Sequence, residues 1–190
     1  GCTVHQLYCN PNGQFQRGTE PTPQNLNELS KTVIEKKADI GFATDPDGDR
    51  LAIIDENGIA LGEEYTFVFC LDGFLNSTKS TNAIVTNLSS TLAIDRIAEK
   101  YGIEVIRSAV GEINVVNKMK EYNALIGGEG NGGVILAESH YGRDSLVGVT
   151  LFLNRLSQEN ASVSQIFQSM PQYVMVKDKF NLGAVDLDSV

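Results

Sequence analysis

The chain has 190 residues, 42% hydrophobic and 21% charged, which is the balance of an ordinary soluble globular protein with one large domain or two small ones. Its formal net charge of −9 disfavours nonspecific binding to nucleic acid or to anionic membranes. The sequence shows no apolar run near the roughly 18 residues of a membrane span and no signal-peptide pattern. Its three widely spaced cysteines and two distant histidines predict a reduced, cytoplasmic setting and no histidine-based metal site.

The first part of the chain alternates predicted strands and helices around one acidic loop. Apolar residues that alternate or recur at helical spacing predict, in chain order, a strand over 3–9, a helix over 25–37, strands over 40–43 and 51–55, and a helix over 63–75. Residues 10–23, rich in proline and glycine, are expected to form a loop. Asn57 and Gly58 indicate a tight reversal of the chain.

After a polar linker at 76–82 the alternation resumes. It predicts, in chain order, a strand over 83–86, a helix over 91–101, a strand over 103–106, a helix over 112–122, short strands at 125–126 and 134–136, and helices over 145–158 and 163–170. We expect Gly102 to end its helix and Asp144 to cap the next-to-last one. The expected fold class is α/β, with two small three-layer α/β/α units, mostly parallel mixed sheets and an incomplete first unit.

The most informative segment is the acidic loop 45–50, which reads Asp-Pro-Asp-Gly-Asp-Arg and links two predicted strands. Two carboxylates about 4 Å apart repel by roughly 1–4 kcal/mol at effective dielectric constants of about 80 down to 20. Because a divalent cation removes that cost, Asp45, Asp47 and Asp49 are candidate ligands for Mg²⁺ or Ca²⁺. Arg50 adds a guanidinium group suited to a phosphate. Such residues also form simple turns, but three alternating carboxylates exceed what a turn requires.

Two known loop types compete for this segment. The calcium loop of EF-hands would use the three aspartates with Glu56 as its twelfth residue, but it needs glycine where Arg50 stands and helices where strands are predicted. In an aspartyl-phosphatase loop, Asp45 would be the nucleophile and Asp47 the acid–base residue. That loop differs at Asp49, and the sequence lacks the later Gly-Asp-x-x-x-Asp segment that completes its metal site.

A third family matches the acidic loop better. The apolar run 40–43 followed by Asp-x-Asp-x-Asp-Arg resembles the metal-binding loop of the α-D-phosphohexomutases, which include phosphoglucomutase, phosphomannomutase and phosphoglucosamine mutase. The resemblance implies Mg²⁺ at Asp45, Asp47 and Asp49. It also implies that Arg50 contacts the phosphoryl group.

The resemblance covers nearly the whole chain and implies a division into parts. Residues 1–76 would be the C-terminal part of the family's second domain, which carries the metal loop. Residues 77–175 would be its third domain, which carries the sugar-binding loop. Residues 176–190 would begin a linker toward a fourth domain.

The resemblance places the sugar at a glycine-rich loop, 128–133. The family's Gly-Glu-x-Ser-Gly pattern corresponds here to Gly-Glu-Gly-Asn-Gly, with Glu129 retained and Asn131 in the place of serine. Asparagine still offers a donor and an acceptor to a hydroxyl. From residue types alone the loop also fits a plain turn, and its Gly-x-Gly-x-x-Gly spacing precedes a strand rather than the helix of a nucleotide site. The resemblance implies further sugar contacts for Gly111 and Glu112, although Gly111 also fits a plain turn. Arg143, in a loop that enters a helix, is a candidate contact for a substrate phosphate, although solvated surface arginines are more common.

The implied reaction moves a phosphoryl group between the C6 and C1 oxygens of a hexose or hexosamine phosphate through a phosphoserine. Neither the family's Ser-His-Asn-Pro motif nor its Arg-x-Ser-Gly-Thr phosphate clamp occurs here, so we expect the middle of a longer enzyme, inactive alone. Its expected partners are the sugar phosphate and the enzyme's remaining domains, without nucleic acid or membrane. An aspartyl phosphatase acting through Asp45 and a calcium- or sugar-binding module remain alternatives.

Overall fold

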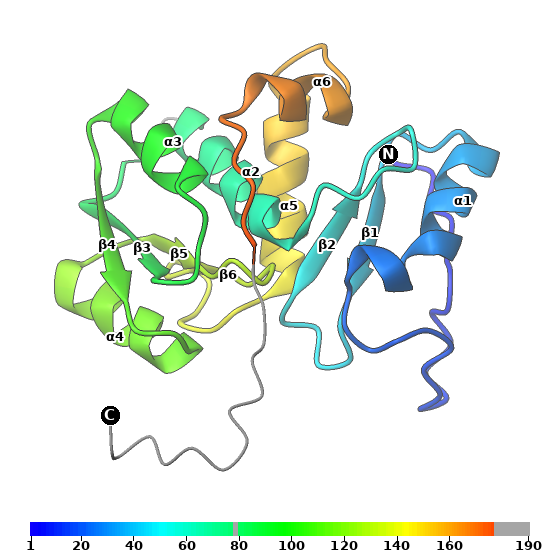
Figure 1. The fold of residues 1–190 in the computed structure, drawn as a ribbon, viewed down its shortest axis with the longest axis horizontal. Helices are drawn as coiled ribbons and strands as arrows, with labels where there is room; N and C mark the ends of the chain where they lie inside the picture. The colour runs from blue at the N-terminus through cyan, green and yellow to red at the C-terminus, as the bar shows by residue number, and fades with distance from the viewer. Residues whose placement is uncertain (78–79, 177–190) are drawn as a thin grey trace.

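The structure, a computed structural model, describes residues 1–77 and 80–176. Figure 1 shows a small unit around a two-stranded hairpin and a larger unit around a four-stranded sheet. The first elements are the 3-10 helix η1 (Pro23–Asn25), α1 (Asn27–Lys36), β1 (Gly41–Thr44), β2 (Leu51–Ile54) and α2 (Glu63–Asn76). The later elements are β3 (Ala83–Asn87), α3 (Ala93–Tyr101), β4 (Glu104–Ser108), α4 (Glu112–Tyr122), β5 (Ile126–Gly128), β6 (Val134–Leu136), α5 (Ser145–Ser157) and α6 (Val163–Ser169).

The small unit is an antiparallel hairpin covered by α1. Strands β1 and β2 pair with Gly41 opposite Ile54, and Val33 of α1 packs with Ile54 in a small core of their own. The expectation of mostly parallel strands is wrong for this unit. Residues 45–50, which join the two strands, are too few for the crossover of a dozen or more residues that parallel pairing needs.

The strand expected over 3–9 is also absent. These residues have no regular structure, and nearly all of them are exposed. Val4 is 74% exposed, so the alternating apolar residues meet no core, and Tyr8 adopts a φ of 55°, which interrupts an extended run. A strand needs a partner for its backbone groups, and sequence alternation alone does not supply one.

The larger unit confirms the three-layer α/β/α expectation. Its strand order is β4-β3-β5-β6, with β3 parallel to β4 and to β5, and β6 antiparallel to β5. Side chains alternate between the two faces of a strand. Ile84 of β3 therefore joins the core formed with α2, α3 and α5, whereas the next residue, Val85, packs with Val115 and Met119 of α4 on the other face.

Helix α2 fills the centre of the molecule. Residues 65–75 are all buried, and they pack with α5, α3 and the four-stranded sheet in one core. A Cβ atom at Gly73 would lie 2.6 Å from the carbonyl oxygen of Leu151, so α2 and α5 approach each other too closely for any side chain there. The expected division after residue 76 puts α2 in the first unit, but its side chains belong to the core of the larger one.

Strand β2 attaches the hairpin to the larger unit. Leu51 and Ile53 reach into the core of the larger unit, and the Thr66 hydroxyl of α2 donates a hydrogen bond to the carbonyl oxygen of Leu51 at 2.7 Å. The backbone N–H of Leu51 donates to the carbonyl oxygen of Gly132 at 3.0 Å. The acidic loop, which ends at β2, is thereby held against the glycine-rich loop.

Helix ends follow the local sequence signals. The Asp144 side chain accepts hydrogen bonds from the backbone N–H groups of Leu146 and Val147, which confirms it as the cap of α5. Gly102 ends α3 with a φ of 65°.

Within the described ranges, no helix has both the length and the apolar character needed to cross a membrane. Apart from residue 176, the expected linker over 176–190 lies outside the described residues.

A side chain in the turn after β2 clamps the small unit to α6. Glu56 accepts hydrogen bonds from the backbone N–H of Ser164 at 3.1 Å and from its hydroxyl group. Burial alone would raise the pKa of Glu56, but the hydrogen bonds from Ser162 and Ser164 outweigh it and hold the pKa at about 2. The carboxylate is therefore charged in the folded protein far below the ordinary glutamate range.

We expect Glu56→Gln to remove part of the pH dependence of stability. Because folding lowers the pKa from 4.5 to about 2, the charged clamp stabilises the protein above pH 4.5, and this contribution disappears as the pH falls toward 2. Urea unfolding should show the wild-type protein losing about 1 kcal/mol more than the variant between pH 6 and pH 3, a value discounted for solvent screening. Glu35→Gln on the exposed side of α1 is the control and should lose as much as the wild type.

Candidate functional site

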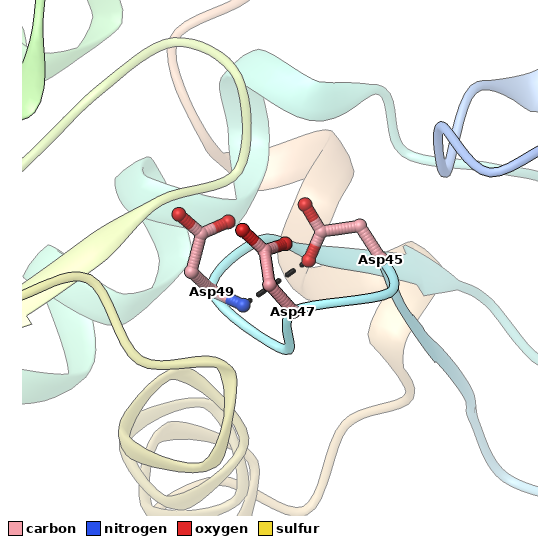
Figure 2. A group of neighbouring side chains, drawn as sticks. All are labelled: Asp45, Asp47 and Asp49. Atoms are coloured by element: carbon pink, nitrogen blue, oxygen red, sulfur yellow. Dashed lines mark hydrogen bonds between the residues drawn. The ribbon is translucent and has the colours of Figure 1, made fainter. Parts of the chain in front are cut away.

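The acidic loop between β1 and β2 brings three carboxylates together (Figure 2). Asp45, Asp47 and Asp49 each offer one oxygen, and these oxygens lie within 4.8 Å of one another. Gly48, with a φ of 73°, turns the chain between them, and its carbonyl oxygen accepts from the N–H of Ser145 at 3.1 Å. The loop is thus anchored at its tip to the start of α5.

Asp45 organises the loop from inside. It is only 5% exposed, and its Oδ1 accepts from the backbone N–H groups of Asp49 at 3.1 Å and Arg50 at 3.0 Å. Its Oδ2 accepts from Nε of Arg50 at 2.6 Å. Burial alone would raise the pKa of Asp45, but the hydrogen bonds from Arg50 outweigh it and leave the pKa below its usual value. Asp45 therefore ionises more readily than an ordinary aspartate, and it lies next to Arg50.

Asp49 has a less satisfied environment. Its Oδ2 accepts from Nη2 of Arg143, but its Oδ1 is buried and has no hydrogen-bond partner among the described residues. Burial raises the pKa of Asp49, and the nearby Asp45 and Asp47 add to the rise while Arg143 opposes it. The nearest cation to Oδ1 is Nε of Arg50, at 3.9 Å. A hard divalent cation among the three aspartates would bind this oxygen directly and offset the repulsion. The residues present therefore fit Mg²⁺ or a similar ion.

Glu129, in the glycine-rich loop, points into the protein. It is 2% exposed, and its Oε1 accepts from the side-chain amide of Asn87 at 2.7 Å and from the N–H of Gly111 at 3.2 Å. Its Oε2 accepts from Nη1 of Arg143 at 2.9 Å. In this arrangement the carboxylate is bound by three internal donors instead of facing an open site. The neighbouring Asn131 uses its side-chain oxygen to accept from the N–H of Gly133 at 3.1 Å.

The remaining predicted site residues gather around Arg143. Gly111 directly precedes α4 and has a φ of 114°, a backbone angle that glycine adopts readily. Glu112 is the first residue of α4. Glu112 accepts from the backbone N–H of Arg143 at 3.1 Å and lies 3.4 Å from its Nε. Arg143, 19% exposed, is therefore surrounded by the carboxylates of Glu112, Glu129 and Asp49. The structure thus joins Gly111, Glu112, Glu129 and Arg143 to Asp49 of the acidic loop, whereas the printed side-chain contact of Asn131 is with Gly133 alone.

Sequence reasoning missed a polar network at the end of β3. The Ser90 hydroxyl donates to the side-chain oxygen of Asn87 at 2.8 Å and accepts from the hydroxyl of Thr86 and the N–H of Gly130. Asn87 in turn holds Glu129. The signal was available, because polar residues occupy the last two positions of buried β3 and recur at 89–91, at the carboxyl edge of a parallel sheet, where α/β proteins place their sites.

Two family models match the chain and together cover most of it. The alpha/beta/alpha domain II of phosphoglucomutase/phosphomannomutase matches residues 1–58, and domain III matches residues 62–173. The chain belongs to the phosphoglucomutase/phosphomannomutase family. The two models meet just before α2, whereas the sequence analysis set the boundary after residue 76.

Curated relatives support the same family. The phosphoglucosamine/phosphogalactosamine mutase of Sulfurisphaera tokodaii is 33% identical over 184 residues, which are 96% of this chain and 40% of that protein. The phosphoglucomutase/phosphomannomutase of Thermococcus kodakarensis is 33% identical over 180 residues, which are 94% of this chain and 39% of that protein. The chain thus spans about two fifths of the length of these relatives.

Solved structures share the fold. A phosphoglucomutase/phosphomannomutase family protein from Burkholderia thailandensis superposes with a TM-score of 0.70 at 24% identity, covering 82% of this chain and 34% of the other. Parafusin, a phosphoglucomutase from Paramecium, superposes with a TM-score of 0.66 at 19% identity, covering 80% and 29%. The relatives are named for different sugars, so their names do not identify a sugar for this chain.

We expect Glu129→Gln to destabilise the protein although it changes only one atom. The amide can no longer accept from all three internal donors, and Arg143 loses a buried counter-charge, which together cost about 2–3 kcal/mol. Urea unfolding measures the loss. Glu121→Gln, which removes an exposed partner of Lys118, is the control and should cost at most about 0.5 kcal/mol. Equal effects of the two variants would contradict the internal role of Glu129.

Proposed function

We propose that this chain supplies the metal- and sugar-binding parts of a phosphohexomutase that interconverts the 1-phosphate and 6-phosphate of a hexose or hexosamine. One observation carries the proposal beyond family membership. Three aspartates converge beside the glycine-rich loop, and among the described residues the buried Oδ1 of Asp49 has no hydrogen-bond partner, with Nε of Arg50 3.9 Å away. A phosphoserine outside this chain would carry the phosphoryl group, as the family resemblance implies.

In this proposal Asp45, Asp47 and Asp49 hold Mg²⁺. The bound ion supplies charge neutralisation for a phosphate that carries roughly −1.5 to −2. Asp45 also fixes Arg50 through the Nε hydrogen bond, which leaves the two terminal nitrogens of the guanidinium group to contact phosphoryl oxygens. The acidic loop then presents a cation and an arginine on one side, an arrangement that stabilises charge on a transferring phosphoryl group.

The sugar would lie against the second group of residues. Asn131, Glu129, Gly111, Glu112 and Arg143 all belong to the edge of the sheet that faces the acidic loop. Glu129 and Arg143 bind each other in the structure, so a sugar hydroxyl would have to exchange with one of these contacts. The unpaired cysteines Cys2, Cys9 and Cys70 support a reduced, cytoplasmic setting.

The phosphatase alternative is less well supported by the geometry. A nucleophilic Asp45 would need an oxygen open to the phosphorus atom. Both oxygens of Asp45 accept hydrogen bonds from Asp49 or Arg50, and the residue is 5% exposed. Strands, not helices, flank the loop, which also disfavours an EF-hand.

Asp47 gives the cleanest test of the metal site. Its side chain is exposed and makes no hydrogen bond within the parts of the chain that the structure describes, so Asp47→Asn should leave the melting temperature unchanged. Removal of one charged ligand should weaken Mg²⁺ binding at least about tenfold in calorimetry. The exposed Asp39→Asn is the control. Unchanged Mg²⁺ affinity in Asp47→Asn would contradict the site, and a much stronger response to Ca²⁺ would favour a calcium-binding module.

The activity itself requires the longer protein. We expect the 190-residue chain to show no conversion of hexose 1-phosphates, while a full-length protein that contains it converts glucose, mannose or glucosamine 1-phosphate to the 6-phosphate. A coupled assay on the three sugars would measure this and identify the preferred one. Conversion by the isolated chain would show that the phosphoserine is not needed from outside, and hydrolysis without isomerisation would favour the phosphatase.

A further inference from the structure

Arg143 lies where the acidic loop meets the glycine-rich loop. It precedes the cap of α5, and its guanidinium group contacts Asp49 from one unit and Glu129 and Glu112 from the other. Its aliphatic stem lies against the backbone of Gly133, where a Cβ atom would collide with it. A single side chain thus touches both halves of the proposed site.

The charges around Arg143 are unbalanced. Five carboxylates, Asp45, Asp47, Asp49, Glu112 and Glu129, share the guanidinium groups of Arg50 and Arg143, which leaves a net charge of −3. Arg17 and Glu20, which interact electrostatically with Asp45 and Arg50, add one charge of each sign and leave that balance unchanged. Arg50 bonds to Asp45, and its Nε also lies 3.9 Å from Oδ1 of Asp49. Arg143, which donates directly to Asp49, is therefore the cation in closest contact with that carboxylate.

Arg143 and a metal ion would make competing demands on Asp49. Arg143 donates to Oδ2, and the other oxygen, Oδ1, is buried without a hydrogen-bond partner among the described residues, 3.9 Å from Nε of Arg50. A divalent cation on this carboxylate would be repelled by the guanidinium group in contact with it. Since Glu129 and Glu112 also hold Arg143, the arginine has partners that would keep it when Asp49 turns to the cation.

The glycine-rich loop would feel this exchange through Glu129. The carboxylate of Glu129 is held by Asn87 and Gly111 on one oxygen and by Arg143 on the other. Arg143 therefore links Glu129 to Asp49 of the acidic loop. A stronger pairing of Arg143 with Glu129 would therefore tighten the loop 128–133 as the cation binds.

We propose that Arg143 is a positioning residue that competes with the cation for Asp49 and transmits cation binding to the glycine-rich loop. The inference rests on the proposed metal site and adds a regulated link between that site and the sugar loop. It gives Arg143 a role toward carboxylates in place of the contact with a substrate phosphate that the sequence suggested.

Mg²⁺ titration of the 190-residue chain tests the competition. Arg143→Gln removes the competing charge and should bind Mg²⁺ about tenfold more tightly than wild type in calorimetry. Arg143→Lys keeps the charge and should stay within about threefold. Arg155→Gln is the matched control, because Arg155 lies at the opposite end of α5 and is held in the same way by Asp72 and Glu159. This control should lose stability without any change in Mg²⁺ affinity.

Hydrogen exchange tests the link to the loop. In wild type, Mg²⁺ should slow exchange of the amides in 128–133 at least about threefold. In Arg143→Gln and Arg143→Lys the slowing should fall below half of that, since neither side chain can fork between Asp49 and Glu129. If the glutamine variant does not fold, the lysine variant still tests the link between Mg²⁺ binding and the loop 128–133.

The outcomes separate the two proposals. If the wild-type chain binds no Mg²⁺ and Asp47→Asn changes nothing, the metal site fails and the inference falls with it. If the wild type binds Mg²⁺ through Asp47 but Arg143→Gln binds equally or more weakly, a merely structural Arg143 is indicated and only the inference is overturned. An unchanged loop response in both Arg143 variants overturns the link.

Discussion

The site depends on a backbone contact between two loops that belong to different units. The N–H of Leu51 donates to Gly132, so the first residue of β2 is fastened to the glycine-rich loop. This contact brings the carboxylates of Asp49 and Glu129 to the same guanidinium group, that of Arg143. Repulsion among the carboxylates opposes the arrangement, and burial of Leu51 in the core of the larger unit offsets it. Apolar packing thus holds together a site that its own charges would separate.

Local signals predicted much of the fold. Asp144 and Gly102 were identified as helix ends because capping involves residues within about four positions of each other. The strand over 3–9 was wrong because a strand depends on a partner elsewhere in the chain. Parallel pairing failed in the small unit for a geometric reason, since the link at 45–50 permits only a hairpin.

The candidate site likewise has one part that the local sequence predicts and another that depends on distant residues. The aspartates of the acidic loop converge because they lie on one short loop, and the sequence displays that loop directly. The environment of Glu129 was not predictable, because Asn87 reaches it across the register of β3 and β5, and Arg143 reaches it from beyond β6. Residue types indicated which side chains matter. The distribution of hydrogen bonds, which turns Glu129 inward and occupies Arg143, needed the structure.

The placement of α2 determines where a segment can be cut for transfer between members of this family. The helix follows the small unit in the chain but contributes Phe67, Phe69 and Phe74 to the core of the larger one. A segment transferred between relatives with its edge after residue 76 would leave the four-stranded sheet with its apolar face open to water. An edge in the short stretch between residues 58 and 62, where the two family models also meet, keeps α2 with the sheet that it covers, and leaves Leu51 and Ile53 of β2 to pack into that core from the preceding segment. The part of the chain that folds around the four-stranded sheet therefore begins with α2, although α2 follows the small unit directly in the sequence.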